Sequence, residues 1–230
     1  MLKALIFDLD GTLANTLPII FESFRRVCRE PLGRDLSDAE VFAGFGPIER
    51  RMLHEHLGPQ RAEALWPAFL AEYEALHEHD CAPFDGVPEA IEDATAAGLR
   101  VALVTGKGPD TAEISLRRLG LAGRFEHVVA GDMESRGKTR LLRRMLELLA
   151  LEPGQAAYLG DSPKDVHDAR EVGLRHALAA AWAPTADRPA LAATAPDALF
   201  DHPLAMRTWL RGLAQPTYTT PQVQHPAGCQ

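Results

Sequence analysis

From residue 84 onward, short apolar runs alternate with stretches whose apolar residues recur at helical spacing. Four runs are typical of buried strands, at residues 101–106, 127–131, 156–161 and 176–181. Four intervening segments are typical of helices, at residues 88–98, 111–120, 138–150 and 163–173. Strands that alternate with helices in this way form a parallel sheet with helices on both faces. We therefore expect an α/β fold with a doubly wound parallel sheet.

The beginning of the chain supplies one more strand and then changes character. Residues 3–10 form an apolar run that ends in carboxylates and glycine, as expected of a buried parallel strand that ends at the solvent. Three amphipathic helices without an intervening strand are expected after it, at residues 19–28, 48–57 and 62–76. The pattern predicts a Rossmann-like core with an all-helical cap inserted after the first strand.

These patterns divide the chain into three parts. Residues 1–15 and 84–214 are expected to form the α/β catalytic core, and residues 16–83 the helical cap. Residues 215–230 are rich in Pro, Thr and Gln and offer little apolar surface to bury, so a flexible tail is expected there.

Composition excludes several classes of partner. The formal net charge of -8 argues against a nucleic-acid partner, because such binding depends on concentrated Lys and Arg. No apolar run approaches the length that crosses a bilayer, and the residues after Met1 resemble a strand instead of a signal peptide. The three cysteines, Cys28, Cys81 and Cys229, have no metal-type or redox-type spacing, so we expect reduced thiols and a cytoplasmic protein. The sequence gives no indication of oligomeric state.

Polar side chains collect where the expected strands end. Ligands of open parallel sheets bind beyond the carboxyl ends of the strands, and four separate segments reach that edge. Their polar residues are Asp8, Asp10, Thr105, Lys107, Lys138, Asp161 and Asp165. Clustered carboxylates need a cation to stay ionised together, and a hard cation that takes few carboxylates and a substrate phosphate is Mg²⁺. The hydroxyl and ammonium groups suit phosphoryl oxygens.

At these residues the sequence resembles the haloacid dehalogenase-like (HAD) hydrolase superfamily. The four motifs occur in the family's order: DLDGTLANT at 8–16, VTGK at 104–107, Lys138, and GDSPKD at 160–165. The third motif often has Pro after its lysine, whereas Thr139 follows Lys138 here. The helical insert after the first motif resembles the cap of the phosphoglycolate phosphatase-like branch.

The resemblance implies roles for the acidic residues. Asp8 would be the nucleophile, and Asp10 would protonate the leaving oxygen and later activate water. Asp8 and Asp161 would bind Mg²⁺ with their side chains, Asp165 would do so directly or through water, and Asp10 would do so with its main-chain carbonyl.

The other matching positions would contact the substrate. Thr105 and Lys138 would hold the phosphoryl oxygens, and glycine at positions 11 and 106 would let backbone N–H groups approach the phosphate. Lys107 would act behind these residues or touch the substrate. Arg50 or Arg51, in the cap loop FAGFGPIERR, would be placed to hold an anionic leaving group.

The resemblance therefore implies a Mg²⁺-dependent phosphatase that hydrolyses a small phosphorylated metabolite, with phosphoglycolate as the first expectation. A sugar phosphomutase and a pyrophosphatase are alternatives with the same core chemistry. A phosphonatase needs a Schiff-base lysine in the cap, and no lysine lies between Asn15 and Gly86. A dehalogenase is disfavoured by Asp10, whose carboxylate suits a phosphoryl leaving group.

Overall fold

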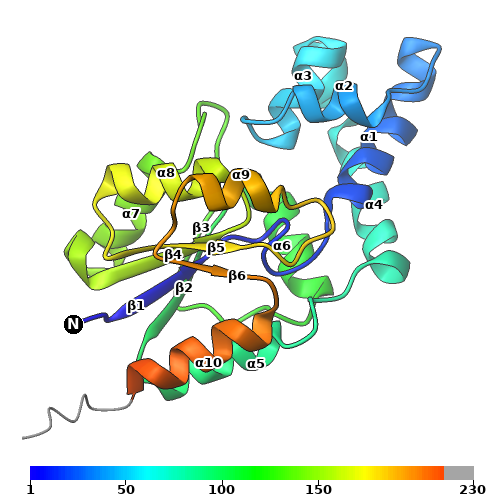
Figure 1. Ribbon diagram of the computed structural model, residues 1–230. Coiled ribbons are helices and arrows are strands. Elements are labelled where there is room, and N and C mark those ends of the chain that lie inside the picture. Colours follow the sequence, from blue (N-terminus) through cyan, green and yellow to red (C-terminus); the bar gives the residue numbers. More distant parts are fainter. Residues whose placement is uncertain (215–230) are drawn as a thin grey trace, which may run out of the picture.

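The computed structural model describes residues 1–214, with the side chains of residues 79, 80 and 214 left aside. Its six strands form one parallel sheet in the order β3-β2-β1-β4-β5-β6 (Figure 1). The strands are β1 (Ala4–Phe7), β2 (Arg100–Val104), β3 (Val128–Val129), β4 (Ala156–Gly160), β5 (His176–Ala180) and β6 (Ala198–Phe200). The predicted doubly wound parallel sheet is confirmed.

Helices cover both faces of the sheet because its strands are apolar on both sides. In β1, Leu5 and Phe7 pack against one layer of helices, and Ala4 and Ile6 pack against the other. The first layer contains α5 (Val87–Ala96), α6 (Pro109–Arg118) and α10 (Pro203–Ala214). The second contains α7 (Thr139–Leu149), α8 (Pro163–Val172) and α9 (Arg188–Ala193), and a short 3-10 turn, η1 (Pro153–Gln155), precedes β4.

Strand β1 is the point at which the strand order reverses. It pairs with β2 on one side and with β4 on the other, so that Phe7 lies opposite both Leu103 and Leu159. Since all three strands run in the same direction, the segments that follow them leave the sheet at one edge, next to one another. Crevices at such reversal points are where open α/β sheets bind their ligands.

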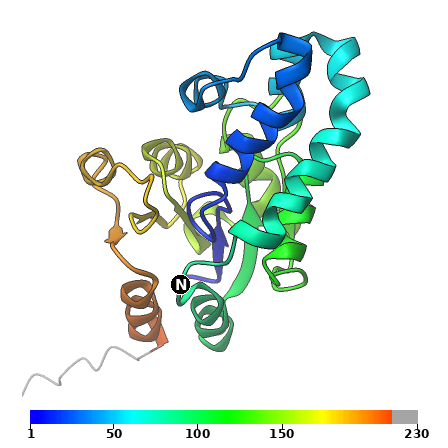
Figure 2. The same ribbon diagram turned by 90° about the vertical axis from the view of Figure 1, so that its right-hand side faces the viewer.

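The insert between β1 and α5 is all-helical, as predicted. It consists of α1 (Leu17–Leu32), α2 (Asp38–Ala43), α3 (Glu49–Leu57) and α4 (Pro59–Asp80), which stand above the carboxyl edge of the sheet (Figures 1 and 2). The four helices pack around their own apolar cluster, in which Phe24, Leu53 and Phe69 are fully buried. Ile114 of α6 also joins this cluster and connects it to the core.

The two connections between cap and core pair with each other. Ala14 and Pro83 form an antiparallel bridge, and the backbone N–H of Phe84 donates to the carbonyl of Leu13 at 2.9 Å. These contacts lie beside the expected domain limits at residues 15/16 and 83/84. The division into separate domains itself stays a prediction, and the expected tail at 215–230 lies outside the described residues.

Several short elements were not predicted. These are α2, α9, β6 and α10. Strand β6 has three residues, too few for a period to be read, and the segment around it is rich in Ala and Pro. Within residues 1–214, no helix has both the length and the apolar character needed to cross a bilayer.

The ends of two helices give a paired test of backbone strain. Helix α7 ends at the exposed Ala150, whose φ is 48°, and α1 ends at Gly33, whose φ is 66°. A left-handed conformation destabilises a residue with a Cβ by about 1–2 kcal/mol, and glycine avoids this cost. Glycine is also more flexible in the unfolded chain, and the entropy that it loses on folding offsets part of this advantage. We expect Ala150→Gly to raise the free energy of unfolding by about 1 kcal/mol and Gly33→Ala to lower it by about 1 kcal/mol. Urea titrations measure the free energy of unfolding of both variants. A change in the same direction in both would contradict this account.

Candidate active site

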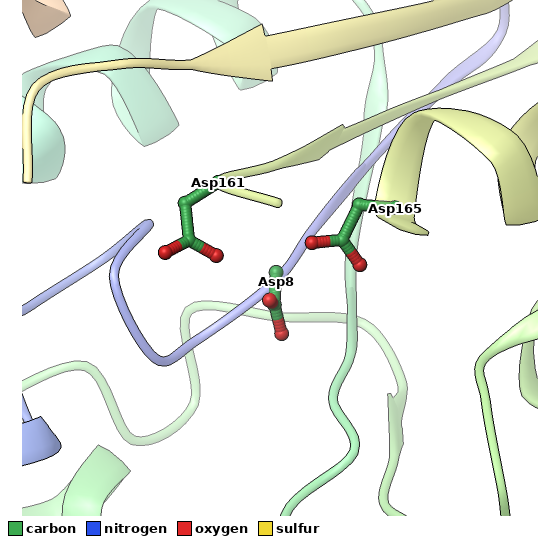
Figure 3. Close-up of side chains that lie close together, drawn as sticks. All are labelled: Asp8, Asp161 and Asp165. Carbon is green, nitrogen blue, oxygen red and sulfur yellow. The ribbon is translucent and has the colours of Figure 1, made fainter. Parts of the chain in front are cut away.

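The carboxylates of Asp8 and Asp161 meet because the strands before them are neighbours. Asp8 follows β1 and Asp161 follows β4, and the backbone N–H of Asp8 donates to the carbonyl of Leu159 at 2.9 Å. In Figure 3 both side chains point into the same space beyond the sheet, together with Asp165. Two acidic residues that are 153 positions apart in the sequence are thus brought together by strand pairing alone.

Asp165 is held in place by the start of helix α8. The Oγ of Ser162, the residue before the helix, accepts a hydrogen bond from the Asp165 backbone N–H at 3.2 Å. In return, the Asp165 carboxylate accepts from the Ser162 N–H at 3.1 Å and from its hydroxyl at 2.6 Å. This reciprocal capping fixes the helix and orients the carboxylate at the same time.

The three carboxylates form a site for a metal ion. Oxygen atoms of Asp8, Asp161 and Asp165 lie within 4.8 Å of one another, and Asp8 and Asp165 are buried. Burial, helped by the neighbouring carboxylates, raises the pKa of Asp8 to about 7 against the opposing effect of Lys138. Burial likewise raises the pKa of Asp161 well above its ordinary value, and the charges of Asp165 and Asp8 add to this. A set of hard oxygen ligands that repel one another fits a divalent cation.

The ammonium of Lys138 lies among these carboxylates. Its Nζ is 2.5 Å from Oδ2 of Asp8 and 2.6 Å from Oδ1 of Asp165. The backbone N–H of Lys138 donates to Asp168 at 2.8 Å, which anchors the start of α7 against α8. Although burial opposes the charged form, the carboxylates raise the pKa of Lys138 well above its ordinary value. Helix α7 begins at Thr139, so the residue that replaces the motif's usual Pro still leaves Lys138 at the helix start.

The predicted phosphate-contacting residues lie around the same point. Thr105 follows β2 and is buried, and its hydroxyl accepts from the Lys107 N–H at 3.2 Å. Gly106 follows it beside the Lys138 side chain. Gly11 has a φ of 71°, and a Cβ at this position would overlap the Asp161 carboxylate. No larger residue can therefore occupy position 11 without displacing a metal-site carboxylate.

Asp10 lies beside the metal site but its carboxylate is not part of the cluster. One of its oxygens accepts a short hydrogen bond from the hydroxyl of Thr16, at the start of the cap, and lies 3.4 Å from the Nζ of Lys107. These contacts tie the Asp10 carboxylate to the start of the cap and to Lys107. The proposed role of the Asp10 main-chain carbonyl as a ligand stays a prediction.

Glu49 is a site residue that the sequence analysis missed. It is the first residue of α3 in the cap, is 4% exposed, and receives hydrogen bonds from three groups of the core. These are Lys107 Nζ at 2.6 Å, Gly108 N–H at 3.0 Å and Thr111 Oγ1 at 3.0 Å. The signal was present in the helical period, because Glu49 shares a face with the apolar Met52 and Leu53, which are three and four residues further on.

Lys107 is consequently enclosed between cap and core. Its Nζ lies 4.8 Å from the centre of the Tyr73 ring, in a cation–π contact. Although burial opposes the charged form, the carboxylates of Asp10 and Glu49 raise the pKa of Lys107 well above its ordinary value. The Tyr73 hydroxyl in turn contacts Ser115 Oγ at 2.8 Å. The cap thus reaches Asp10 through a continuous chain of buried polar contacts.

Arg50 is not brought into the site. Its guanidinium pairs with Glu63, with Nε 2.9 Å from Oε1, and lies 5.8 Å from the centre of the Trp66 ring. It faces the outer side of the cap, and we do not include it in the site proposed below. The neighbouring Arg51 instead spans cap and core by donating to the carbonyl of Met133 at 2.9 Å.

A cavity of about 710 Å³ lies between the cap and the carboxyl edge of the sheet. All the residues predicted for the site line it except Gly11 and Arg50. The cap contributes mostly apolar side chains to its wall, among them Phe21, Phe42, Phe45 and Met52. The cavity thus has one polar end, at the carboxylates and Lys138, and one apolar side.

Known proteins are similar to this chain in sequence and fold. A family model described as haloacid dehalogenase-like hydrolase matches residues 5–179. The phosphoglycolate phosphatase of Rhodospirillum rubrum is 32% identical over 188 residues, which cover 76% of this chain and 78% of that protein. The N-acetylmuramic acid 6-phosphate phosphatase of Pseudomonas aeruginosa is 31% identical over 187 residues, covering 76% and 80%. A haloacid dehalogenase-like hydrolase structure from Streptococcus pneumoniae gives a TM-score of 0.73 at 25% identity, covering 90% of this chain and 98% of that one.

The pair formed by Glu49 and Lys107 allows a double-mutant test. Removal of one partner leaves a buried charge without its counterion, so Glu49→Leu and Lys107→Met should each lower the free energy of unfolding by about 3–5 kcal/mol. The double variant should lose less than the two single losses combined, because neither charge is left behind. Urea unfolding of all four proteins measures the coupling. Simple additivity would mean that the two side chains do not depend on each other.

Proposed function

The chain belongs to the haloacid dehalogenase-like hydrolase family, in its phosphoglycolate phosphatase-like branch, and we propose that it hydrolyses a small phosphomonoester through an aspartyl-phosphate on Asp8. The observation that carries this proposal is the meeting of Asp8, Asp161 and Asp165 with the Lys138 ammonium at one end of the cavity between cap and core. Such a set of groups neutralises the charge of a phosphoryl group while an oxygen nucleophile attacks it.

The first step transfers the phosphoryl group to the enzyme. A carboxylate oxygen of Asp8 forms a bond to phosphorus, and the bond from phosphorus to the leaving oxygen breaks. Asp10 donates its proton to that oxygen, and the alcohol leaves. Lys138, the Thr105 hydroxyl and backbone N–H groups at Gly11 and Gly106 hold the remaining phosphoryl oxygens.

The second step returns the enzyme to its starting state. Asp10, now ionised, accepts a proton from water, and the resulting hydroxide attacks phosphorus and releases Asp8. Inorganic phosphate leaves. The contacts of the Asp10 carboxylate with Thr16 and Lys107 support this assignment, because they hold the side chain beside the reacting group without placing it in the metal site.

We further propose that the metal is Mg²⁺. Asp8, Asp161 and Asp165 would hold it with carboxylate oxygens, and Asp10 with its main-chain carbonyl. Few protein ligands, all of them oxygens, leave positions for water and substrate phosphate, which is the arrangement that Mg²⁺ favours. When bound, the ion neutralises charge on the phosphoryl oxygens and keeps Asp8 ionised.

Sequence similarity does not select the substrate. Two relatives of nearly equal identity are named for different substrates, phosphoglycolate and N-acetylmuramic acid 6-phosphate. A sugar phosphomutase or a pyrophosphatase would use the same core residues. A phosphatase releases phosphate, whereas a mutase isomerises a sugar phosphate in the presence of a bisphosphate, so assays of both reactions distinguish the two. We propose a cytoplasmic location, where phosphorylated metabolites are found.

Substitutions of the two catalytic aspartates should have different effects. Asp8→Asn should reduce phosphate release by about 10⁴-fold or more, because no nucleophile remains. Asp10→Asn should slow turnover but still allow Asp8 to be phosphorylated by an activated substrate such as p-nitrophenyl phosphate, since its second step lacks a base. Mass spectrometry after acid quenching detects the phosphoryl group on Asp8. Asp35→Asn, at an exposed cap position, is the matched control, and full activity of Asp8→Asn would falsify the assignment.

The metal site can be tested without measuring activity. At a Mg²⁺ concentration of about 100 times its Kd, the ion should raise the Tm by roughly 5–10 °C, because it binds the folded state and relieves the repulsion among the carboxylates. Asp161→Asn should lose most of this rise. An equal rise in the variant would show that Mg²⁺ binds elsewhere.

A further inference from the structure

Two aromatic side chains of the cap are exposed to solvent, which is unfavourable for apolar groups. Phe42 is 58% exposed and Phe45 is 36% exposed. Among the Phe, Tyr and Trp side chains of residues 1–214 these two are the most exposed, and both line the cavity. Covering an exposed apolar ring lowers the free energy of the system. The position of these rings at a binding cavity therefore points to a ligand that covers them.

These rings continue into a third. The ring centres of Phe42 and Phe45 lie 5.2 Å apart, and those of Phe45 and Phe21 lie 6.0 Å apart. We refer to Phe21, Phe42 and Phe45 as the aromatic wall. The wall belongs to the cap, whereas the metal-site carboxylates belong to the core, so a substrate whose phosphate lies at the carboxylates would direct its leaving group toward the cap.

The cap offers no cation to that leaving group. The only charged residues that it contributes to the described cavity lining are Asp38 and Glu49, and both are acids. Asp38 pairs with Arg25, and Glu49 with Lys107. A leaving group with a carboxylate or a second phosphate would therefore meet no positive partner on this side.

The cations of the core are also engaged. Apart from Lys138, the described lining contains Lys107, Lys164 and Arg136. Lys107 is enclosed by Glu49, Lys164 lies 2.9 Å from Asp168, and Arg136 lies 3.8 Å from Glu55. The side chains of Lys164 and Arg136 are 59% and 57% exposed, so their pairs are surface contacts. A carboxylate on the leaving group would have to displace an existing pair to gain a cation.

The aromatic wall suits an aromatic leaving group better than a sugar. The hydroxyl groups of a sugar need hydrogen-bonding partners when they are buried, and the wall offers none, so such partners would have to come from polar lining residues such as Thr185 and Asp187. The volume of about 710 Å³ is large for a two-carbon acid and lies within the roughly 300–1,000 Å³ typical of pockets for drug-sized ligands. A flat apolar ring matches both the volume and the chemistry of the wall.

We propose that the substrate is a phosphomonoester whose leaving alcohol carries an uncharged aromatic ring, and that this ring stacks on the aromatic wall. The inference rests on the phosphatase function proposed above and narrows its substrate class. It assigns Phe42 and Phe45 as residues that determine specificity by contact with the leaving group.

The test compares three substrates with a primary alcohol as leaving group. Benzyl phosphate and ethyl phosphate differ by the ring, and phosphoglycolate carries a carboxylate instead. We expect kcat/KM for benzyl phosphate to exceed that for ethyl phosphate by about 10- to 100-fold, as expected for the burial of one aromatic ring. Phosphoglycolate should be no better than ethyl phosphate. A preference for phosphoglycolate over benzyl phosphate would overturn the inference.

Variants of the wall identify the source of the preference. Phe42→Ala and Phe45→Ala should each reduce the ratio of kcat/KM for benzyl phosphate to that for ethyl phosphate by about 3- to 10-fold, and the double variant should remove most of the preference. Phe45→Leu should restore part of it. Leu148→Ala, which removes a similarly exposed apolar side chain remote from the cavity, should leave the ratio unchanged.

The outcomes separate this inference from the function on which it rests. An unchanged ratio in the double wall variant, with active enzyme, overturns the inference and leaves the phosphatase function intact. A failure of the wild-type protein to release phosphate from all three compounds in the presence of Mg²⁺ overturns both.

Discussion

Repulsion among the buried carboxylates is the constraint on which the site depends. Asp8, Asp161 and Asp165 are fixed by two adjacent strands and a capped helix, so none of them can move away from the others. Their charges must be balanced locally, which explains why Lys138 contacts two of them and why its own backbone is tied to α8. The folded chain therefore maintains a position of negative potential that favours a bound cation.

A second buried charge network joins the cap to this site. Glu49 of the cap contacts Lys107, which lies beside Asp10, and the backbone and hydroxyl groups of α6 complete the set. Separation of cap and core would remove the Glu49 carboxylate from the three core groups that donate to it, Lys107, Gly108 and Thr111. Lys107 would then keep only Asp10 as its carboxylate partner, so the contact that holds the cap over the cavity also affects the surroundings of Asp10.

The sequence predicted those features that local patterns determine. Asp8 and Asp161 could be assigned because each directly follows an apolar strand-like run, and parallel strands end at one edge. Glu49 could have been separated from Arg50 by the helical period, since Met52 and Leu53 lie on its face, but the sequence does not show which core groups that face contacts. The contact between Glu49 and Lys107 joins cap and core across 58 positions, and no local pattern encodes such a docking. The strand β6 was missed because three residues cannot establish a period.

The pairing of Ala14 with Pro83 means that the cap leaves and re-enters the sheet domain at the same place. An excursion whose two ends are already joined does not alter the path of the chain through β1, β2 and β4 (Figure 2). Segments of different length or helix arrangement can be accommodated between these two points at small entropic cost, because loop closure depends only weakly on loop length. The sheet therefore places the strand ends that carry Asp8, Thr105 and Asp161 whatever the length of the inserted cap, whereas the contact of Glu49 with Lys107 makes the surroundings of Lys107 depend on the cap.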